Sequence, residues 1–197
     1  EDLAPNQVAI AGYFCDNLDQ TFAGQRYLAR QLRYVSRSKT VPVNATDLGD
    51  LNVFPLEPEK HFSAVISQCE EVLKLGTYLV LVGGDSSGLK ALGAAVENVV
   101  NLDVPIVSIS NNNKLNLSKT QKIILSVDLK DLAGKWVSKP RRLNGLSPSQ
   151  IITQINNIPN KIIAVAIFGL APELDGRGRT ETQVALNILE AVVKRLN

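Results

Sequence analysis

The sequence has few of the residues that most often bind metals, form disulfides or act as catalytic bases. It contains one histidine, two cysteines, one tryptophan and no methionine. Cys15 and Cys69 lie far apart without CxxC spacing, which indicates neither a disulfide framework nor a zinc site. We expect two reduced, mostly buried thiols, and therefore a cytoplasmic location or another reducing compartment.

Long hydrophobic runs and a strong net charge are also absent. No run approaches the roughly 18 uninterrupted apolar residues of a membrane-spanning helix, so we expect no membrane span. The formal net charge of +2 is too small to indicate nucleic acid or an anionic membrane as the main partner. The chain begins at Glu1 and has no Met, so a targeting segment removed before Glu1 stays an open alternative.

What is present is an ordinary globular composition, with 45% apolar and 20% charged residues, and no linker or repeat. We therefore expect a single domain over residues 1–197. Short apolar runs, several near-continuous in Val, Ile and Leu, predict strands at Gln7–Phe14, Thr40–Ala45, Tyr78–Val82, Pro105–Ile109, Lys122–Leu129 and Lys161–Phe168. Apolar residues at helical spacing lie between many of them. Strands that alternate with helices predict an α/β fold with three α-β-α layers and a mainly parallel sheet.

The turn after the strand at 78–82 carries the most suggestive short motif. Ligands of parallel α/β sheets bind at the carboxyl ends of the strands, and here the sequence Gly84–Gly88 fits the G-x-S-x-G pattern of a nucleophile elbow around Ser86. A serine nucleophile needs a base, usually a histidine that follows it in the elbow fold. The only histidine, His61, precedes Ser86, and its polar neighbours predict a solvated helix-start position. We therefore expect no serine nucleophile.

Four segments, in the right order along the chain, are similar to one enzyme family. They are "VLVGGDSS" at Val80–Ser87, "LSVDLKDLAG" at Leu125–Gly134, "GLSPSQIITQI" at Gly145–Ile155 and "AIFGLAPELDGRGRTETQVALNILEAVV" at Ala166–Val193. They resemble the GGDHS turn, the S-x-D-x-D strand end, the GLSP helix start and the C-terminal block of the ureohydrolases, the arginase and agmatinase superfamily. The resemblance implies an arginase-like fold, trimmed by the short stretch between Asn111 and Ser126.

The resemblance also implies a site whose ligands this chain mostly lacks. Two Mn²⁺ ions in the family convert water into a hydroxide that attacks a guanidinium or amidine carbon. Ser86 stands where the family has a histidine, Lys130 where it has a second carboxylate, and Gly169 where it has a catalytic glutamate; Asp128 keeps a ligand position. Residues 110–115 supply no carboxylate or imidazole for the D-A-H-x-D motif. We expect no cofactor, or Mn if the site is functional.

Lys130 is the clearest departure from the family pattern. Its ammonium could pair with Asp128 or Asp85 in place of a metal, and this hypothesis predicts that Lys130→Asp destabilises the fold. The carboxylate of Asp85 can accept backbone N–H bonds that tie neighbouring loops together. The alternative is a rebuilt catalytic site formed by Asp85, Asp128 and Asp131.

Two basic features are candidates for partner binding. Arg26, Arg30, Arg33 and Arg37 have the spacing of one helix face, which indicates an anion-binding or partner-docking stripe or, alternatively, a solvated outer face. The basic segment 135–142 holds Trp136, Arg141 and Arg142, residue types that are enriched at interface hot spots. Trp136 covering the core is the alternative.

We interpret the chain as a non-catalytic ureohydrolase homologue, a pseudoenzyme that acts as a structural, scaffold or regulatory partner. Its partner would be another protein or further copies of the same chain. The alternative is a metal-dependent hydrolase of C–N bonds in a small guanidine-like or amidine-like substrate.

Overall fold

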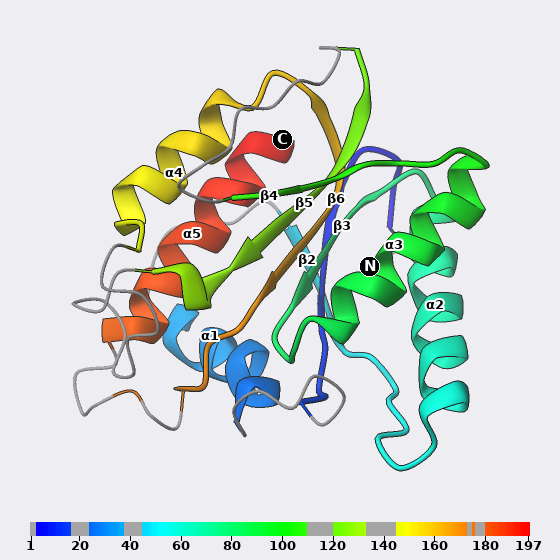
Figure 1. Cartoon of the computed structure of the whole chain (residues 1–197), viewed down its shortest axis with the longest axis horizontal. Coiled ribbons are helices and arrows are strands. Elements are labelled where there is room, and N and C mark those ends of the chain that lie inside the picture. Colours follow the sequence, from blue (N-terminus) through cyan, green and yellow to red (C-terminus); the bar gives the residue numbers. More distant parts are fainter. Residues whose placement is uncertain are drawn as a thin grey trace.

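The computed structural model describes residues 3–16, 24–37, 45–109, 120–132, 145–172, 175 and 180–197. In chain order its elements are β1 (Val8–Gly12), the 3-10 helix η1 (Gln25–Tyr27), α1 (Leu28–Ser36), β2 (Ala45–Asp50), α2 (Pro58–Lys74), β3 (Tyr78–Val82), α3 (Ser87–Val100), β4 (Ile106–Ser108), β5 (Lys122–Asp128), the 3-10 helix η2 (Leu129–Asp131), α4 (Pro148–Asn157), β6 (Lys161–Phe168) and α5 (Thr180–Leu196). Strands and helices alternate along most of the chain (Figure 1).

Within the described residues, six strands form one parallel sheet in the order β2-β1-β3-β6-β5-β4. The central strands β3 and β6 are runs of mostly buried aliphatic residues, because helices cover both faces of the sheet. Their bounds coincide with the predicted ones. The predicted strand at 40–45 overlaps β2 only at Ala45 among the described residues, and β2 continues beyond the prediction to Asp50. As a largely exposed edge strand, β2 carries no apolar run that a sequence pattern could detect. Residues 40–44 lie outside the described residues.

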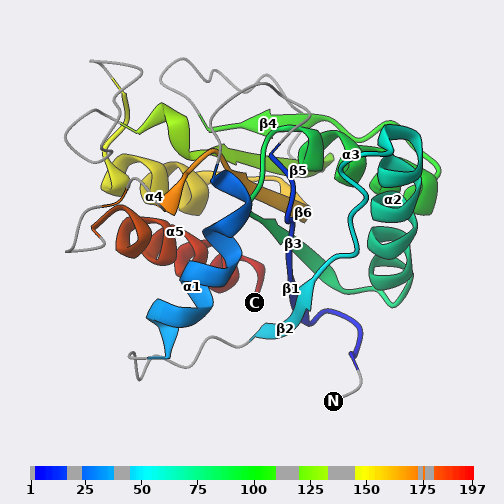
Figure 2. The ribbon, with the colours of Figure 1, turned by 90° about the horizontal axis from the view of Figure 1, so that it is seen from below.

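The helices form two layers on opposite faces of the sheet, as Figure 2 shows. Helices α1, α4 and α5 enclose one hydrophobic core, which includes Leu32, Ile155 and Ile188. Helices α2 and α3 enclose the other core, which includes Val65 and Leu92. The predicted three-layer α/β fold with a parallel sheet is therefore confirmed.

Several local sequence signals also lead to the expected structure. Ser147 and Gln150 form a reciprocal capping box at the start of α4. Gly76 follows α2 with a φ of +76°, a left-handed conformation that glycine adopts at low cost. The thiols of Cys15 and Cys69 are buried, and burial raises the pKa of Cys69 to about 12. None of the described helices is long and apolar enough to cross a membrane.

Candidate functional site

The carboxyl ends of four neighbouring strands meet at one edge of the sheet, which we call the carboxyl edge. Gly12 of β1 is in register with Val82 of β3, and Val82 with Ile167 of β6. Phe168, the last residue of β6, is in register with Asp128 at the end of β5. The turns that follow these strands therefore converge, and this is the edge at which parallel α/β sheets bind ligands.

The glycine turn after β3 packs tightly against the chain that follows β1. Gly84 has a φ of +67°, and a Cβ on it would collide with the Tyr13 ring and lie 2.5 Å from the Cys15 carbonyl oxygen. The Gly84 N–H donates to the carbonyl of Gln25 (3.0 Å), and the Asp85 N–H donates to the carbonyl of Cys15 (3.0 Å). Only glycine fits this close approach of backbone to backbone.

Asp85 is fully buried in this turn and is held by Ser87. Its Oδ1 accepts hydrogen bonds from the Ser87 backbone N–H (2.9 Å) and from the Ser87 hydroxyl. The backbone bond is the kind of contact that the sequence predicts for Asp85. The carboxylate thereby satisfies a donor at the start of α3.

His61 lies in the interior, contrary to the predicted solvated position. Its side chain is fully buried, and its Nε2 lies 2.7 Å from the Tyr13 hydroxyl. The polar residues before it suggested exposure, but His61 occupies the inward face of α2 together with Val65 and Cys69. The spacing of four residues between these three positions was the available sequence signal, since residues at i and i+4 share a helix face.

Together, Asp85, Ser87, Tyr13 and His61 form a buried hydrogen-bonded chain, which we call the Asp85 network. The Phe54 N–H donates to His61 Nδ1 (3.2 Å), so a neutral His61 carries its proton on Nε2 and donates to Tyr13. Tyr13 then donates to Ser87 Oγ (2.7 Å), and Ser87 donates to Asp85. Each of these donors in the Asp85 network therefore has an acceptor.

Burial favours the neutral forms of two members of the Asp85 network. It lowers the pKa of His61, although the negative charge of Asp85 acts in the opposite direction. It also raises the pKa of Tyr13 well above its usual range, against the effect of the Ser87 hydrogen bond. The sequence indicated no role for Tyr13 or Ser87: Tyr13 lies in no motif, and Ser87 lies in the Val80–Ser87 segment, where Ser86 and Asp85 were the candidates.

The structure gives Ser86 no feature of a catalytic nucleophile. Ser86 is the N-cap residue of α3 with φ of −65° and ψ of −10°, an ordinary helical conformation rather than the strained one of a nucleophile elbow. The serine connected to His61 through Tyr13 is Ser87, which is 3% exposed. A buried hydroxyl that already donates to a carboxylate is not positioned to attack a substrate.

At the end of β5, Lys130 forms an ion pair with Asp128, one of the two partners, Asp128 or Asp85, that the sequence suggests. The Lys130 Nζ lies 3.5 Å from Asp128 Oδ2, and the Lys130 N–H donates to Asp128 Oδ1 (2.9 Å). The ammonium also lies 5.9 Å from the centre of the Phe168 ring. Burial raises the pKa of Asp128, while the bonds and charge of Lys130 act to lower it.

Because Gly169 has no side chain, the Asp128–Lys130 pair can occupy the space beside it. It has a φ of +89°, and a Cβ there would collide with Asp128 Oδ1 and lie 3.1 Å from two carbons of the Lys130 side chain. A glutamate at position 169 is therefore incompatible with the observed pair, in addition to the backbone strain it would introduce.

The described residues of the carboxyl edge do not fit a two-metal centre. Ser86, Lys130 and Gly169 provide no carboxylate or imidazole, and the carboxylate of Asp85 is turned towards Ser87. Among the described residues, no three His, Cys, Asp or Glu side chains form a group that could hold a metal, so Asp85, Asp128 and Asp131 do not form such a cluster. Residues 110–115, where the D-A-H-x-D motif would fall, lie outside the described residues.

The four arginines of the predicted stripe have different environments. Arg26 lies 3.8 Å from Asp16 and 4.9 Å from the centre of the Tyr27 ring. Arg33 forms a bidentate bond to Asp47 through Nε (2.7 Å) and Nη2 (2.9 Å) and a further bond to Asp50. Arg30 and Arg37 are exposed. Trp136, Arg141 and Arg142 lie outside the described residues.

The fold is shared with solved structures of ureohydrolases. Proclavaminate amidino hydrolase from Streptomyces clavuligerus matches with a TM-score of 0.81 and 13% identity, over 98% of this chain and 93% of that one. Formimidoylglutamase from Bacillus subtilis matches with a TM-score of 0.81 and 13% identity, over 99% and 88% of the two chains. Arginase from Medicago truncatula matches with a TM-score of 0.79 and 11% identity, over 96% and 87%.

No protein-family model matches the sequence, and no curated protein matches it. At such low identities the structural likeness shows an arginase-like fold, as the sequence resemblance predicts. A shared fold does not by itself determine the activity, which depends on the residues at the site.

Proposed function

We propose that the chain is a non-catalytic homologue of the ureohydrolases that acts as a structural, scaffold or regulatory partner. The observation that carries this proposal is the ion pair between Lys130 and Asp128. At the strand end that would present metal ligands in the family, an ammonium already neutralises the carboxylate. A divalent cation would have to displace a largely buried positive charge, which is electrostatically costly. The protein would therefore need no metal cofactor.

The test combines metal analysis with a charge reversal. Wild-type protein purified without chelators is expected to contain far less than one Mn, Fe or Ni ion per chain. Lys130→Asp should lower the free energy of unfolding by about 2–3 kcal/mol, because two carboxylates then face each other. Added Mn²⁺ should restore part of this loss in the variant and leave the wild type unchanged.

A matched control is Lys122→Asp, the same substitution at the exposed amino end of β5. It should change stability by no more than about 0.5 kcal/mol and should not respond to Mn²⁺. Stoichiometric metal in the wild type, or a Lys130→Asp variant as stable as the wild type, would overturn the proposal.

The contact surface that we assign to the partner is the outward face of α1. Arg26 and Arg33 are engaged with carboxylates of the same chain, whereas Arg30 and Arg37 are exposed and bracket Tyr34, which is 60% exposed. Arginine and tyrosine are enriched at interface hot spots. The segment with Trp136, Arg141 and Arg142 is assigned as a second contact on composition alone.

Light scattering coupled to size exclusion tests the assembly. We expect a mass well above the 21.4 kDa of one chain, and dissociation in the double variant Arg30→Glu/Arg37→Glu. The control, Lys90→Glu/Lys194→Glu, makes the same charge change at exposed positions of α3 and α5 and should leave the assembly intact. A wild-type monomer that captures no partner would contradict the scaffold role.

A C–N hydrolase is the second candidate function, and the names of the structural matches favour it, since they include an amidino hydrolase and an arginase. The rebuilt site of Asp85, Asp128 and Asp131 would have to carry it, with Mn as the metal. Assays of urea or ammonia release from guanidine and amidine compounds, with and without Mn²⁺, decide between the two. The non-catalytic proposal predicts no release above the buffer control.

A further inference from the structure

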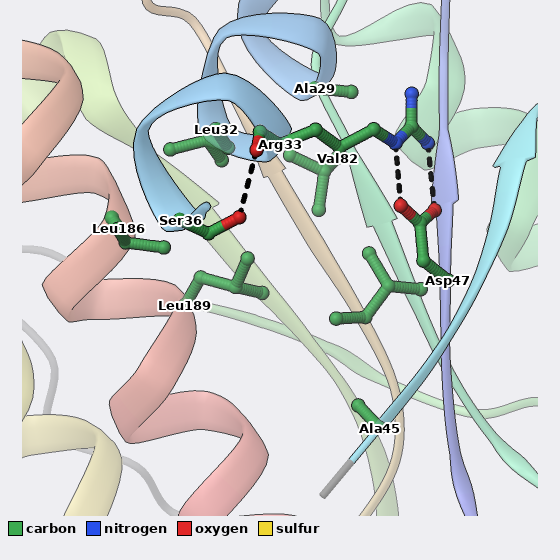
Figure 3. A pocket seen from close by; sticks show the side chains of 10 residues that line it. Ala29, Leu32, Arg33, Ser36, Ala45, Asp47, Val82, Leu186 and Leu189 are labelled. Carbon is green, nitrogen blue, oxygen red and sulfur yellow. Dashed lines mark hydrogen bonds and ion pairs between the residues drawn. The ribbon is translucent and has the colours of Figure 1, made fainter. Parts of the chain in front are cut away.

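A cavity of about 260 Å³ lies between α1, α5 and the β2 side of the sheet (Figure 3). Its apolar lining includes Ile10 of β1, Val82 of β3, Leu32 of α1, and Leu186 and Leu189 of α5. All five side chains are aliphatic. The cavity therefore offers dispersion contacts to a compact, flexible apolar group rather than stacking contacts to a flat ring.

The cavity exists because small residues stand where α1 and β2 approach each other. Ala29 and Ala45 line it from the two sides, and neither side chain is long enough to fill the space. Ala45 shares a sheet face with Asp47, because strand residues two apart point to the same side. Among the described residues, β2 is an edge strand, so only its β1 side is paired with another strand.

The polar groups that line the cavity satisfy one another. The guanidinium of Arg33 reaches across from α1 to Asp47 on β2 and binds it at 2.7 and 2.9 Å, as the dashed lines of Figure 3 show. The Ser36 hydroxyl donates to the Arg33 carbonyl at 3.0 Å and can still accept a hydrogen bond. Arg33 and Asp47 are the charged residues of the lining, and their charges cancel.

We propose that this cavity binds a small aliphatic molecule with one uncharged, hydrogen-bonding head group, such as a medium-chain alcohol. A charged head would find its counter-ion already bound in the Arg33–Asp47 pair and would lose its hydration without compensation. An engineered apolar cavity of about 150 Å³ holds benzene, which has six heavy atoms. In proportion, the present cavity of about 260 Å³ has room for about ten heavy atoms. This inference is independent of the proposed function, because its test measures neither metal content nor assembly.

The first experiment titrates linear alcohols from butanol to dodecanol into the full chain and follows the methyl NMR signals of Ile10, Leu186 and Leu189. Affinity is expected to rise about fourfold for each added methylene while the cavity fills. It should level off once the alcohol has about ten heavy atoms. Hexanoate and hexylamine should bind at least tenfold more weakly than hexanol.

Variants on β2 locate the site. Ala45→Ile places a larger side chain on the cavity face of the strand and should weaken hexanol binding at least tenfold. Thr46→Ile places the same side chain on the opposite face of β2 and should change affinity less than twofold. Ser36→Leu fills the cavity from α1 and provides a second test if Ala45→Ile folds poorly.

A charge variant tests the head-group preference. Arg33→Met leaves Asp47 and Asp50 without their counter-ion, so hexylamine should gain at least tenfold in affinity relative to hexanol. The inference fails if no alcohol gives saturable shifts at these methyl groups, or if Ala45→Ile and Thr46→Ile behave alike. It also fails if hexanoate or hexylamine binds the wild type as tightly as hexanol does.

Discussion

Asp85 and Asp128 are two carboxylates at the same edge of the sheet, but the protein stabilises them by different means. Asp85 is fully buried and accepts hydrogen bonds from the backbone N–H and hydroxyl of Ser87. The side chain of Asp128 is 28% exposed and pairs with the ammonium of Lys130. Neutral donors can hold a deeply buried carboxylate without burying a second charge, whereas Asp128 pairs with an ammonium that is itself largely buried, so that each charge compensates the desolvation of the other.

This difference shows two ways in which residues of the same chain stabilise a carboxylate at the carboxyl edge of the sheet. The deep carboxylate is built into a polar chain that reaches His61 on α2 through Tyr13. The shallow one depends on a single lysine two residues further along the chain. Loss of a hydrogen-bond or ion-pair partner should therefore destabilise the fold more at Asp85 than at Asp128. The following predictions test this expectation.

The largest effect is expected for Asp85→Ala. The substitution removes the acceptor of two hydrogen bonds at a fully buried position and should lower the free energy of unfolding by about 3–5 kcal/mol. Urea unfolding followed by circular dichroism measures this loss. The exposed Asp103→Ala is the control and should stay within about 0.5 kcal/mol of the wild type. If Asp85→Ala lowered the free energy of unfolding by less than about 1 kcal/mol, the proposed difference between Asp85 and Asp128 would be wrong.

A smaller and pH-dependent effect is expected for Lys130→Met. At pH 7 the variant should lose about 1–2 kcal/mol, because Asp128 stays partly buried without its ammonium. Burial already raises the pKa of Asp128, and loss of the lysine raises it further. The folded variant then binds a proton more readily than the unfolded chain does, so its deficit relative to the wild type should shrink as the pH falls towards 4.

Unfolding titrations at several pH values measure this deficit, and Asp128→Asn in the Lys130→Met background should recover most of it at pH 7. A deficit that is the same at pH 4 and pH 7 would mean that Lys130 stabilises the fold through its aliphatic packing rather than its charge.

The wild type itself should lose stability in mild acid through His61. Burial lowers the pKa of His61 in the fold, so the unfolded chain takes up a proton first as the pH falls below about 6.5. The stabilisation is complete above this pH, and its loss has a limiting slope of about 1.4 kcal/mol per pH unit. Unfolding curves between pH 7 and pH 5 measure the slope. It should flatten in His61→Gln, since no other histidine is present, and an equal slope in both proteins would contradict a neutral buried His61.

The sequence was most informative where the structure depends on residues that are close together in the chain. The apolar runs at 78–82 and 161–168 predicted β3 and β6, because a strand covered on both faces must be apolar throughout. The sequence left Asp128 and Asp85 as possible partners of Lys130, and the structure shows the partner that is nearer in the chain, Asp128, separated by one position at the strand end.

Long-range contacts were less accessible. His61 meets Tyr13 across 48 positions of the chain, and the polar residues before His61 concealed its place on the inward stripe of α2. The cavity beside Ala29 and Ala45 depends on how closely α1 and α5 approach the sheet, which no local pattern encodes. The continuation of β2 to Asp50 was missed because its edge position makes most of its residues polar.

The smallest effect is expected for Ser86→Ala, although Ser86 holds the central position of the G-x-S-x-G pattern. Ser86 is half-buried and its backbone is helical, so loss of the hydroxyl should change the free energy of unfolding by no more than about 0.5 kcal/mol. Ser87→Ala is the matched substitution one residue later, and it should cost about 2 kcal/mol because Tyr13 loses its acceptor and Asp85 loses a donor. Urea unfolding of the two variants side by side gives the ranking. If Ser86→Ala costs as much as Ser87→Ala, the Asp85 network includes Ser86 as well, and the turn holds its carboxylate through both serines.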